Sequence, residues 1–449
     1  MNTPIADFVK GYEKQNMARF HMPGHKGNRF LGCENWDITE IAGADALYEA
    51  EGIIAESEAN ATALFGTGRT VYSTEGSSQC IRAMLYLATT RQKDNARPTI
   101  VAARNVHKAF VYAAAMLDLD VIWLWPEESH SLCSCIVEAT QLERTLQQLE
   151  KPPVAVYVTS PDYLGGQLDI SELAEVCHRN NTILAVDNAH GAYLRFVEPS
   201  LHPIDLGADL TCDSAHKTLP VLTGGAYLHI SKRVAEPFAD MAKSAMALFG
   251  STSPSYLTLM SLDSCNLYLS EGYKDRLKDT VEQVCMLRTE LRHAGWKILE
   301  TEPLKVTVEM PKGLSGLKKA KELRGQGIEC EYADEEYIVC MITPENTETD
   351  LKKLSNAFGE NHSSYEESKD TNVLIKETKS ERKMTIRDAV LAQQEQVPIM
   401  EAVGRICGTP TVSCPPAIPI VVSGEMIDKR AIPIFQKYGI KTVDVVKEK

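Results

Sequence analysis

A short apolar run followed by polar residues decides the fold, and it reads Ile183-Leu184-Ala185-Val186-Asp187-Asn188-Ala189-His190-Gly191. Residues 183–186 have the length and the β-branched composition of a buried strand. Comparable runs occupy residues 99–102, 154–159 and 226–230, and helical patterns at 81–88 and 171–179 lie between them. Because strands that alternate with helices form βαβ units, the sequence predicts a doubly wound α/β fold around a largely parallel sheet.

The pattern changes after residues 253–255, which read Ser-Pro-Ser. Residues 256–294 predict one long helix, and a new alternation of strands and helices follows to about residue 356. Residues 360–383 are dense in glutamate, lysine and serine, which predicts a solvated linker. We therefore expect an N-terminal segment (1–55), a large domain (56–294), a small domain (295–358), a charged linker (359–383) and a C-terminal domain (384–449).

Composition limits the classes of function. The 449 residues are 44% hydrophobic and 24% charged, which is ordinary for a globular protein of two or three domains. A formal net charge of -14 repels phosphate backbones and anionic lipid, so we expect neither a nucleic-acid nor a membrane partner. No run approaches eighteen apolar residues and the first residues lack a signal-peptide pattern, so we expect a cytoplasmic protein. The 12 cysteines form no CxxC pair, which predicts buried free thiols.

The sharpest chemical signal is the segment 213–219, which reads Asp-Ser-Ala-His-Lys-Thr-Leu. A lysine among small polar residues near a sheet, here Lys217, is suited to desolvation, which lowers the pKa of the amine and lets it form a Schiff base. Upstream, the strand at 183–186 delivers Asp187 to its C-terminal end, where open α/β sheets place ligand chemistry. This carboxylate is suited to keep a heterocyclic nitrogen protonated, and Gly191 indicates a close backbone approach. A surface lysine and a turn aspartate are the simpler alternatives.

Two further features precede these residues. Residues 73–79 read Ser-Thr-Glu-Gly-Ser-Ser-Gln ahead of a predicted helix, and glycine with hydroxyls at a helix start makes an anion cradle. The segment matches neither the Walker loop nor the GxGxxG motif. Serines that only cap the helix would give the same pattern, so this simpler interpretation stays open. His107 follows the strand at 99–102 and is placed over the same sheet edge, unless it is an ordinary loop histidine.

These four elements converge on one cofactor, pyridoxal phosphate. Its phosphate would rest on residues 76–78, its ring under His107, its pyridinium nitrogen on Asp187 and its aldehyde on Lys217. The aspartate would keep the ring cationic, so that the ring withdraws electrons from the substrate α-carbon.

The chain resembles the Orn/Lys/Arg decarboxylase family, which is pyridoxal phosphate-dependent. The resemblance implies an aspartate-aminotransferase-like α/β large domain with a mostly parallel central sheet, plus smaller α+β C-terminal domains. It also implies the compact form of the family, without an N-terminal receiver-like wing domain. Besides the aspartate and lysine motifs, the motifs that carry it are 20–27 (FHMPGHKG), 37–40 (DITE), 51–54 (EGII), 104–108 (RNVHK), 159–166 (TSPDYLGG), 251–256 (STSPSY) and 402–406 (AVGRI) with Pro415-Pro416.

The resemblance implies decarboxylation of lysine, arginine or ornithine to the corresponding amine and CO2. The catalytic residues that we expect are Lys217, Asp187, His107 and His216. The residues that we expect to contact the cofactor are Gly76, Ser77, Ser78, His107, Asp187, His190, Ser214, His216, Lys217, Ser251 and Ser253. In the family, the positions of Ser251 and Ser253 approach the cofactor phosphate of a neighbouring subunit, which implies a homodimer or a larger homo-oligomer.

No metal site is expected. His21 and His25 are four residues apart, but Pro23 and Gly24 break the helix that would place them on one face. By resemblance, His25 instead lines the substrate entrance.

The chain also departs from the usual family motifs. Glu75 stands where asparagine is usual, Ala46 replaces one acid, Gly224 replaces glutamine, and Cys414 replaces tyrosine in a Tyr-Pro-Pro-Gly motif that here ends in Ala417. Two alternatives therefore stay open. One is another enzyme of the same fold, an aminotransferase or a β-eliminating lyase. The other is an inactive cofactor-binding relative that regulates a true decarboxylase.

Overall fold

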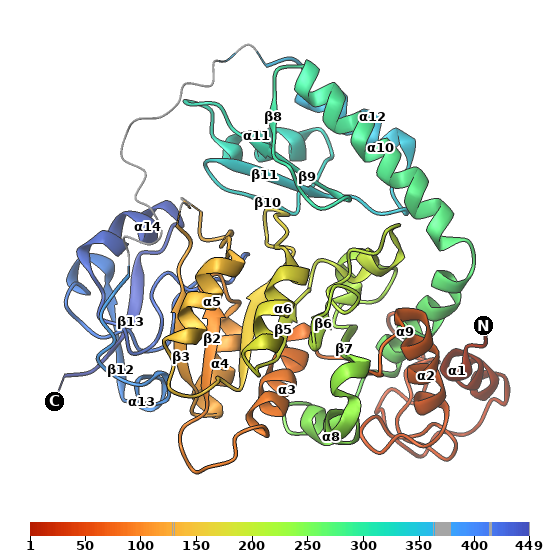
Figure 1. Ribbon diagram of the computed structural model, residues 1–449. Helices are drawn as coiled ribbons and strands as arrows, with labels where there is room; N and C mark the ends of the chain where they lie inside the picture. The colour runs from red at the N-terminus through yellow and green to blue at the C-terminus, as the bar shows by residue number, and fades with distance from the viewer. Residues whose placement is uncertain (128, 130, 362, 364–378, 413–414, 449) are drawn as a thin grey trace. The chain divides into compact units, whose positions relative to one another are not determined.

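The computed structural model describes the whole chain except residues 128, 130, 362, 364–378, 413–414 and 449 (Figure 1). The chain divides into two compact units, of which unit 1 comprises residues 1–93 and 170–276 and unit 2 comprises residues 94–169 and 277–449. Each unit is described by itself. Most of the predicted linker at 360–383, and the departure at Cys414, lie outside the described residues.

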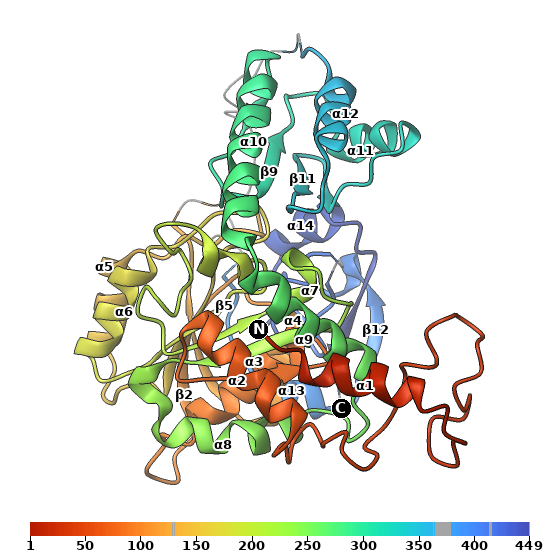
Figure 2. The same ribbon diagram turned by 90° about the vertical axis from the view of Figure 1, so that its right-hand side faces the viewer.

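Unit 1 holds most of the residues singled out in the sequence. Its elements in chain order are α1 (Pro4–Lys14), α2 (Ile53–Phe65), β1 (Arg69–Ser73), α3 (Ser77–Thr89), α6 (Ile170–Arg179), β5 (Leu184–Asp187), β6 (Leu210–Asp213), α7 (Ala215–Thr218), β7 (Ala226–Ile230), α8 (Ala235–Ala247) and α9 (Tyr256–Ser270). Helices α1, α2 and α9 pack against one another, as both views show (Figure 1, Figure 2).

The strands of unit 1 follow the order β1, β7, β6, β5. β5 and β6 are parallel with Asp187 opposite Cys212, whereas β7 is antiparallel to both β6 and β1. Nearly every residue of these strands is buried, because helices cover the sheet. Since β5 and β6 run in the same direction, the polar residues that follow them meet at one sheet edge.

Unit 2 begins with three parallel strands in the order β4, β2, β3. An antiparallel sheet in the order β10, β11, β9, β8 follows, and a two-stranded ladder of β12 and β13 ends the chain. The first group comprises β2 (Thr99–Ala103), α4 (Lys108–Met116), β3 (Asp120–Leu124), α5 (Ala139–Gln147) and β4 (Ala155–Thr159). The second comprises α10 (Tyr273–His293), β8 (Lys297–Ile298), β9 (Lys305–Glu309), α11 (Gly316–Gly325), β10 (Tyr332–Ala333), β11 (Tyr337–Met341) and α12 (Glu348–Phe358). The last comprises α13 (Ile386–Leu391), β12 (Gln394–Pro398), α14 (Ile432–Lys437) and β13 (Thr442–Val446).

The predicted strands at 99–102, 154–159, 183–186 and 226–230 are confirmed within one residue at each end by β2, β4, β5 and β7. The prediction of one helix over 256–294 is wrong, because the chain forms α9 and α10 with a break between them. Gly272 has a φ of +64° at this break, a left-handed conformation that ends a helix. Among the described residues, no helix combines the length and the apolar character that crossing a membrane requires.

Candidate active site

Lys217 lies in α7, a single turn that follows β6 directly. Its Nζ is 2.8 Å from Nε2 of His190, which belongs to the turn after the neighbouring strand β5. His190 is buried, and Lys217 is partly exposed. The parallel pairing of β5 and β6 therefore brings a lysine amine and an imidazole together at the sheet edge.

Asp187 is the last residue of β5 and is buried. Its Oδ1 accepts a hydrogen bond from the Ala189 amide at 3.2 Å, and the Cys212 thiol lies 3.5 Å from the same atom. Burial, followed by the negative charge of Asp187, raises the pKa of Cys212 well above its ordinary value. The structure thus places a buried carboxylate beside a neutral thiol, immediately before the turn that carries His190.

The predicted anion cradle is the turn between β1 and α3. Gly76 precedes the helix with a φ of +74°, and a Cβ added there would meet nothing within 4 Å. The space beside Gly76, directly before the first amide groups of this 13-residue helix, is therefore not filled, which suits an anion site. Ser214 Oγ donates to Ser77 Oγ at 2.8 Å, which ties the cradle to the segment that carries Lys217.

Gly224, one of the departures from the usual motifs, closes the other side of this turn. The Gly76 amide donates to its carbonyl at 2.7 Å. Gly224 has a φ of +97°, and a Cβ there would lie 2.7 Å from the Thr74 carbonyl oxygen. In this chain the position therefore accommodates glycine and excludes a larger side chain unless the backbone moves.

Glu75, a second departure, is exposed, and its carboxylate accepts a hydrogen bond from the Ser251 amide. Ser251 Oγ in turn accepts from the Ser253 amide at 3.1 Å, and both serines are exposed. Within one chain, Glu75 thus holds the serine segment. The contact of these serines with a neighbouring subunit stays a prediction.

The two remaining histidines occupy different units. His216 lies beside Lys217 in α7, and its Nδ1 is 3.0 Å from the Gly225 carbonyl oxygen, so Nδ1 carries the proton of that hydrogen bond. His107 belongs to unit 2, where it caps α4 by accepting from the Ala109 amide at Nδ1. The structure therefore brings Lys217, His190, Ser214 and Ser77 together within unit 1, and it places His107 on the turn after β2 in unit 2.

Asp213 has a role that the sequence analysis missed. It is fully buried, its Oδ2 lies 2.9 Å from His202 Nε2 and 3.2 Å from His229 Nε2, and its Oδ1 accepts from Asn188 at 2.8 Å. Burial opposes ionisation of Asp213, but the two imidazoles lower its pKa well below the ordinary range.

Among the described residues, this trio is the one group whose spacing would suit a metal ion. The other ring nitrogen of each histidine has a partner as well. His202 Nδ1 accepts a hydrogen bond from the Ile204 amide, and His229 Nδ1 is 2.8 Å from Thr70 Oγ1. We therefore interpret it as a buried hydrogen-bond network at the end of β6. No sequence signal joins these residues except the proximity of Asp213 to Lys217.

Arg104 is the second missed residue, and it lies within unit 2. Its guanidinium donates to the carbonyl oxygens of Pro419 and Ile420 at 2.9 Å each, and it lies 3.6 Å from the Glu425 carboxylate. The Lys108 amide also donates to Ala417 at 2.9 Å. These contacts attach the C-terminal segment to the turn that carries His107. The signal in the sequence was an arginine directly after a buried strand.

Comparison with known proteins shows the family of the chain. Residues 3–312 match the family model described as "Orn/Lys/Arg decarboxylase, major domain", and residues 368–439 match its C-terminal domain. The chain therefore belongs to the Orn/Lys/Arg decarboxylase family, as the motifs predicted. It is a decarboxylase of basic amino acids and thus a carboxy-lyase of amino acid metabolism.

Three relatives illustrate the likeness. The arginine decarboxylase of Bacillus subtilis is 30% identical, over 98% of this chain and 94% of its own length. The solved lysine decarboxylase LdcF of Francisella novicida is 16% identical with a TM-score of 0.82, over 99% of this chain and 81% of its own. An SPT solved with PLP is 14% identical with a TM-score of 0.53, over 70% of this chain and 79% of its own. The fold is therefore that of the fold-type-I enzymes, which confirms the predicted class.

Proposed function

We propose that this chain is a pyridoxal phosphate-dependent decarboxylase that converts arginine to its amine and CO2, with Lys217 as the residue that binds the cofactor covalently. The observation that carries the proposal is the 2.8 Å contact between Lys217 Nζ and His190 Nε2, at the edge where β5 and β6 end. Arginine is favoured over lysine and ornithine because the arginine decarboxylase of B. subtilis is the more similar relative by sequence.

The residues present fit this cofactor. The open start of α3 with Ser77 and Ser78 would hold the phosphate, since Gly76 leaves that space clear. Asp187, a buried carboxylate at the end of β5, would face the ring nitrogen. When bound, pyridoxal phosphate supplies an electron-withdrawing ring that accepts the electron pair left by the departing carboxylate.

The chain's own groups manage the protons. Lys217 reacts as a nucleophile only when its amine is neutral, and His190 Nε2 is placed to accept the proton from Nζ. His216 Nδ1 donates to the Gly225 carbonyl, so its Nε2 would first have to take up a proton before it could return one to the substrate α-carbon, and the Lys217 amine is the other candidate donor. The contact of His107 with the ring stays a prediction from the sequence.

The test is a product assay. The purified protein, supplied with pyridoxal phosphate, is incubated separately with arginine, lysine and ornithine, and CO2 and the respective amines agmatine, cadaverine and putrescine are measured. We expect agmatine from arginine in wild type and in Lys232→Ala, an exposed control lysine, and no product from Lys217→Ala. Keto acid without CO2 would instead indicate an aminotransferase. Bound cofactor without turnover of any substrate would indicate the regulatory alternative.

We also propose that the enzyme is a homodimer or a larger homo-oligomer. Ser251 and Ser253 are exposed in the single chain. Pro254, which follows them and precedes α9, is buried, so it fixes the turn that presents the two serines to solvent. A second copy of the chain that covers this turn would complete the site.

A further inference from the structure

Two cysteines in unit 2, which the decarboxylase chemistry does not use, lie in contact. Cys330 precedes β10, and Cys340 belongs to β11, which pairs with β10 in antiparallel register with Tyr332 opposite Val339. The two Sγ atoms are 4.0 Å apart, and the Cys340 thiol donates to the Cys330 sulfur. Both thiols are free. The strand pairing therefore holds two reducing groups side by side, although ten positions separate them.

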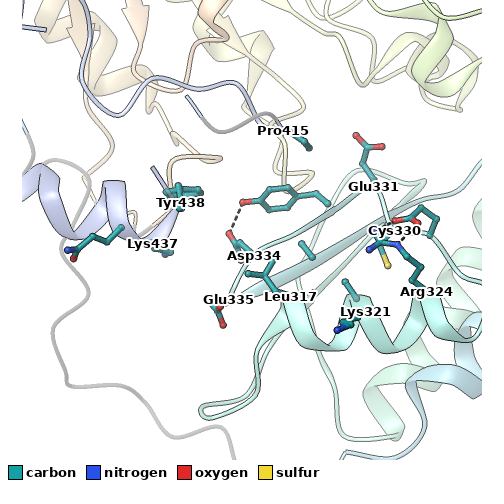
Figure 3. A pocket seen from close by; sticks show the side chains of 16 residues that line it. Leu317, Lys321, Arg324, Cys330, Glu331, Asp334, Glu335, Pro415, Lys437 and Tyr438 are labelled. Atoms are coloured by element: carbon teal, nitrogen blue, oxygen red, sulfur yellow. Dashed lines mark hydrogen bonds and ion pairs between the residues drawn. The ribbon is translucent and has the colours of Figure 1, made fainter. Parts of the chain in front are cut away.

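The pair can be reached from solvent. Cys330 is partly exposed and lines a cavity of about 600 Å³ with residues of α11 and β10 (Figure 3). It also lines a second cavity of about 400 Å³, together with Cys340, which is itself 7% exposed. A small oxidant would thus reach Cys330 first, while Cys340 lies behind it.

The surroundings of the pair make its two thiols different. The hydrogen bond that Cys340 donates is the main cause that lowers the pKa of Cys330, and the positive charge of Arg324 lowers it further. Partial burial and the charge of Glu329 act in the opposite direction. The same hydrogen bond, with burial, raises the pKa of Cys340 well above its ordinary value. Cys330 is therefore the more readily ionised sulfur, and the thiolate is the reactive form.

We propose that Cys330 and Cys340 form a reversible disulfide when the protein meets a hydroperoxide. The Cys330 thiolate attacks one peroxide oxygen, the O–O bond breaks, and for hydrogen peroxide the released hydroxide takes a proton to become water. Cys330 is then a sulfenic acid. The Cys340 sulfur attacks the Cys330 sulfur, the S–S bond forms as the S–O bond breaks, and the hydroxide leaves as water with the proton of the Cys340 thiol. Two electrons pass from the two thiols to the peroxide.

The geometry requires little movement. A disulfide has its sulfur atoms about 2 Å apart, so the two Sγ atoms, now 4.0 Å apart, must approach by roughly 2 Å. Glu331, the next residue, accepts a hydrogen bond from the Tyr163 hydroxyl at 2.7 Å. A disulfide would therefore tie the segment that carries Glu331 to β11. Tyr163, the hydrogen-bond partner of Glu331, belongs to the family motif at 159–166.

The experiment uses the full-length reduced protein. Samples are treated with hydrogen peroxide, remaining thiols are alkylated, and the denatured protein is cleaved after glutamate. We expect a cross-linked pair of the peptides 330–331 and 337–345, two hydrogens lighter than the reduced peptides together and separated by dithiothreitol. Cys285→Ser, which removes an exposed cysteine, should leave the cross-link unchanged, whereas Cys330→Ser should abolish it.

A second variant tests which cysteine reacts first. In Cys340→Ser, the sulfenic acid on Cys330 has no resolving thiol, so dimedone should label Cys330 more than Cys285. Circular dichroism would establish that each variant is folded. Alkylation of both Cys330 and Cys340 in full after peroxide treatment would overturn the proposal, as would dimedone labelling of Cys285 alone. The readout requires no decarboxylase activity, so it is independent of the proposed function.

Discussion

Lys217 Nζ and His190 Nε2 lie 2.8 Å apart, although 27 positions separate the two residues in the sequence. The contact exists because β5 and β6 are parallel neighbours, and each delivers its following turn to the same edge. It places an imidazole where it can accept a proton from the amine that we assign to the cofactor.

Replacement of His190 by glutamine removes this proton acceptor and keeps a polar side chain. We expect kcat/KM to fall by about a hundredfold, as for loss of a general base, and the acidic limb of the pH–rate profile to move. His293→Gln, an exposed histidine at the end of α10, is the matched control and should keep the wild-type profile. An unchanged profile in His190→Gln would show that another group accepts the proton.

Asp187→Asn should still bind the cofactor but turn over more slowly by about a hundredfold or more, because an amide does not stabilise a protonated ring nitrogen. Visible absorbance of the bound cofactor separates binding from turnover. Asp240→Asn, an exposed position in α8, controls for loss of one negative charge. Near-normal turnover in Asp187→Asn would mean that the wrong acid has been assigned.

Gly224→Ala should lower the free energy of unfolding by about 1–2 kcal/mol, because the left-handed conformation disfavours a Cβ. The new Cβ would also lie 2.7 Å from the Thr74 carbonyl oxygen. The distortion should loosen the hydrogen bond from Gly76 and weaken cofactor binding in a titration. Gly224→Gln, the usual family residue, should be no better tolerated. Gly325→Ala, where nothing lies within 4 Å of the new Cβ, is the control in urea unfolding.

The buried network around Asp213 predicts how stability depends on pH. Burial lowers the pKa of His229, so below about pH 6.5 the unfolded chain binds a proton that the folded chain resists. The free energy of unfolding should therefore fall with decreasing pH, by up to about 1.4 kcal/mol per unit for this one group. The lowered pKa of Asp213 adds a further loss when the pH falls below about 4.

Urea titrations between pH 8 and pH 4 provide the measurement. His229→Gln should be less stable at pH 7 and should lose part of the slope below about pH 6.5. His293→Gln should retain the full slope. Equal slopes in His229→Gln and wild type would show that other groups cause the acid sensitivity.

Complementation tests whether each site is built from two chains. Lys217→Ala and Ser253→Ala are each expected to be severely impaired. In a mixed dimer, one site carries both defects and the other carries neither, so mixing should yield activity above that of either parent. Dilution to monomer should release cofactor and activity together. A fully active monomer in sedimentation experiments would rule out a shared site.

The strands and the chemical motifs of this protein follow from local pattern. Apolar runs of four to six residues predicted β2, β4, β5 and β7, because a strand that is buried on both faces, whether parallel like β5 or antiparallel like β7, leaves a continuous hydrophobic signature. The prediction of one helix over 256–294 was wrong. Hydrophobic periodicity indicates the amphipathic face of a helix, but it does not register a single residue such as Gly272, whose positive φ ends the helix.

The sequence by itself determined the family and the fold class, and it predicted the residue types of the site, because these residues lie in contiguous motifs that strand ends and helix starts position locally. Only the tertiary structure decided which of these residues meet. The contacts of Asp213 with His202 and His229, of Arg104 with the segment at 419–425, and of Cys330 with Cys340 depend on strand order and register. Local propensity carries no information about such pairings, because they form between segments that are joined only when the whole sheet and its covering layers assemble.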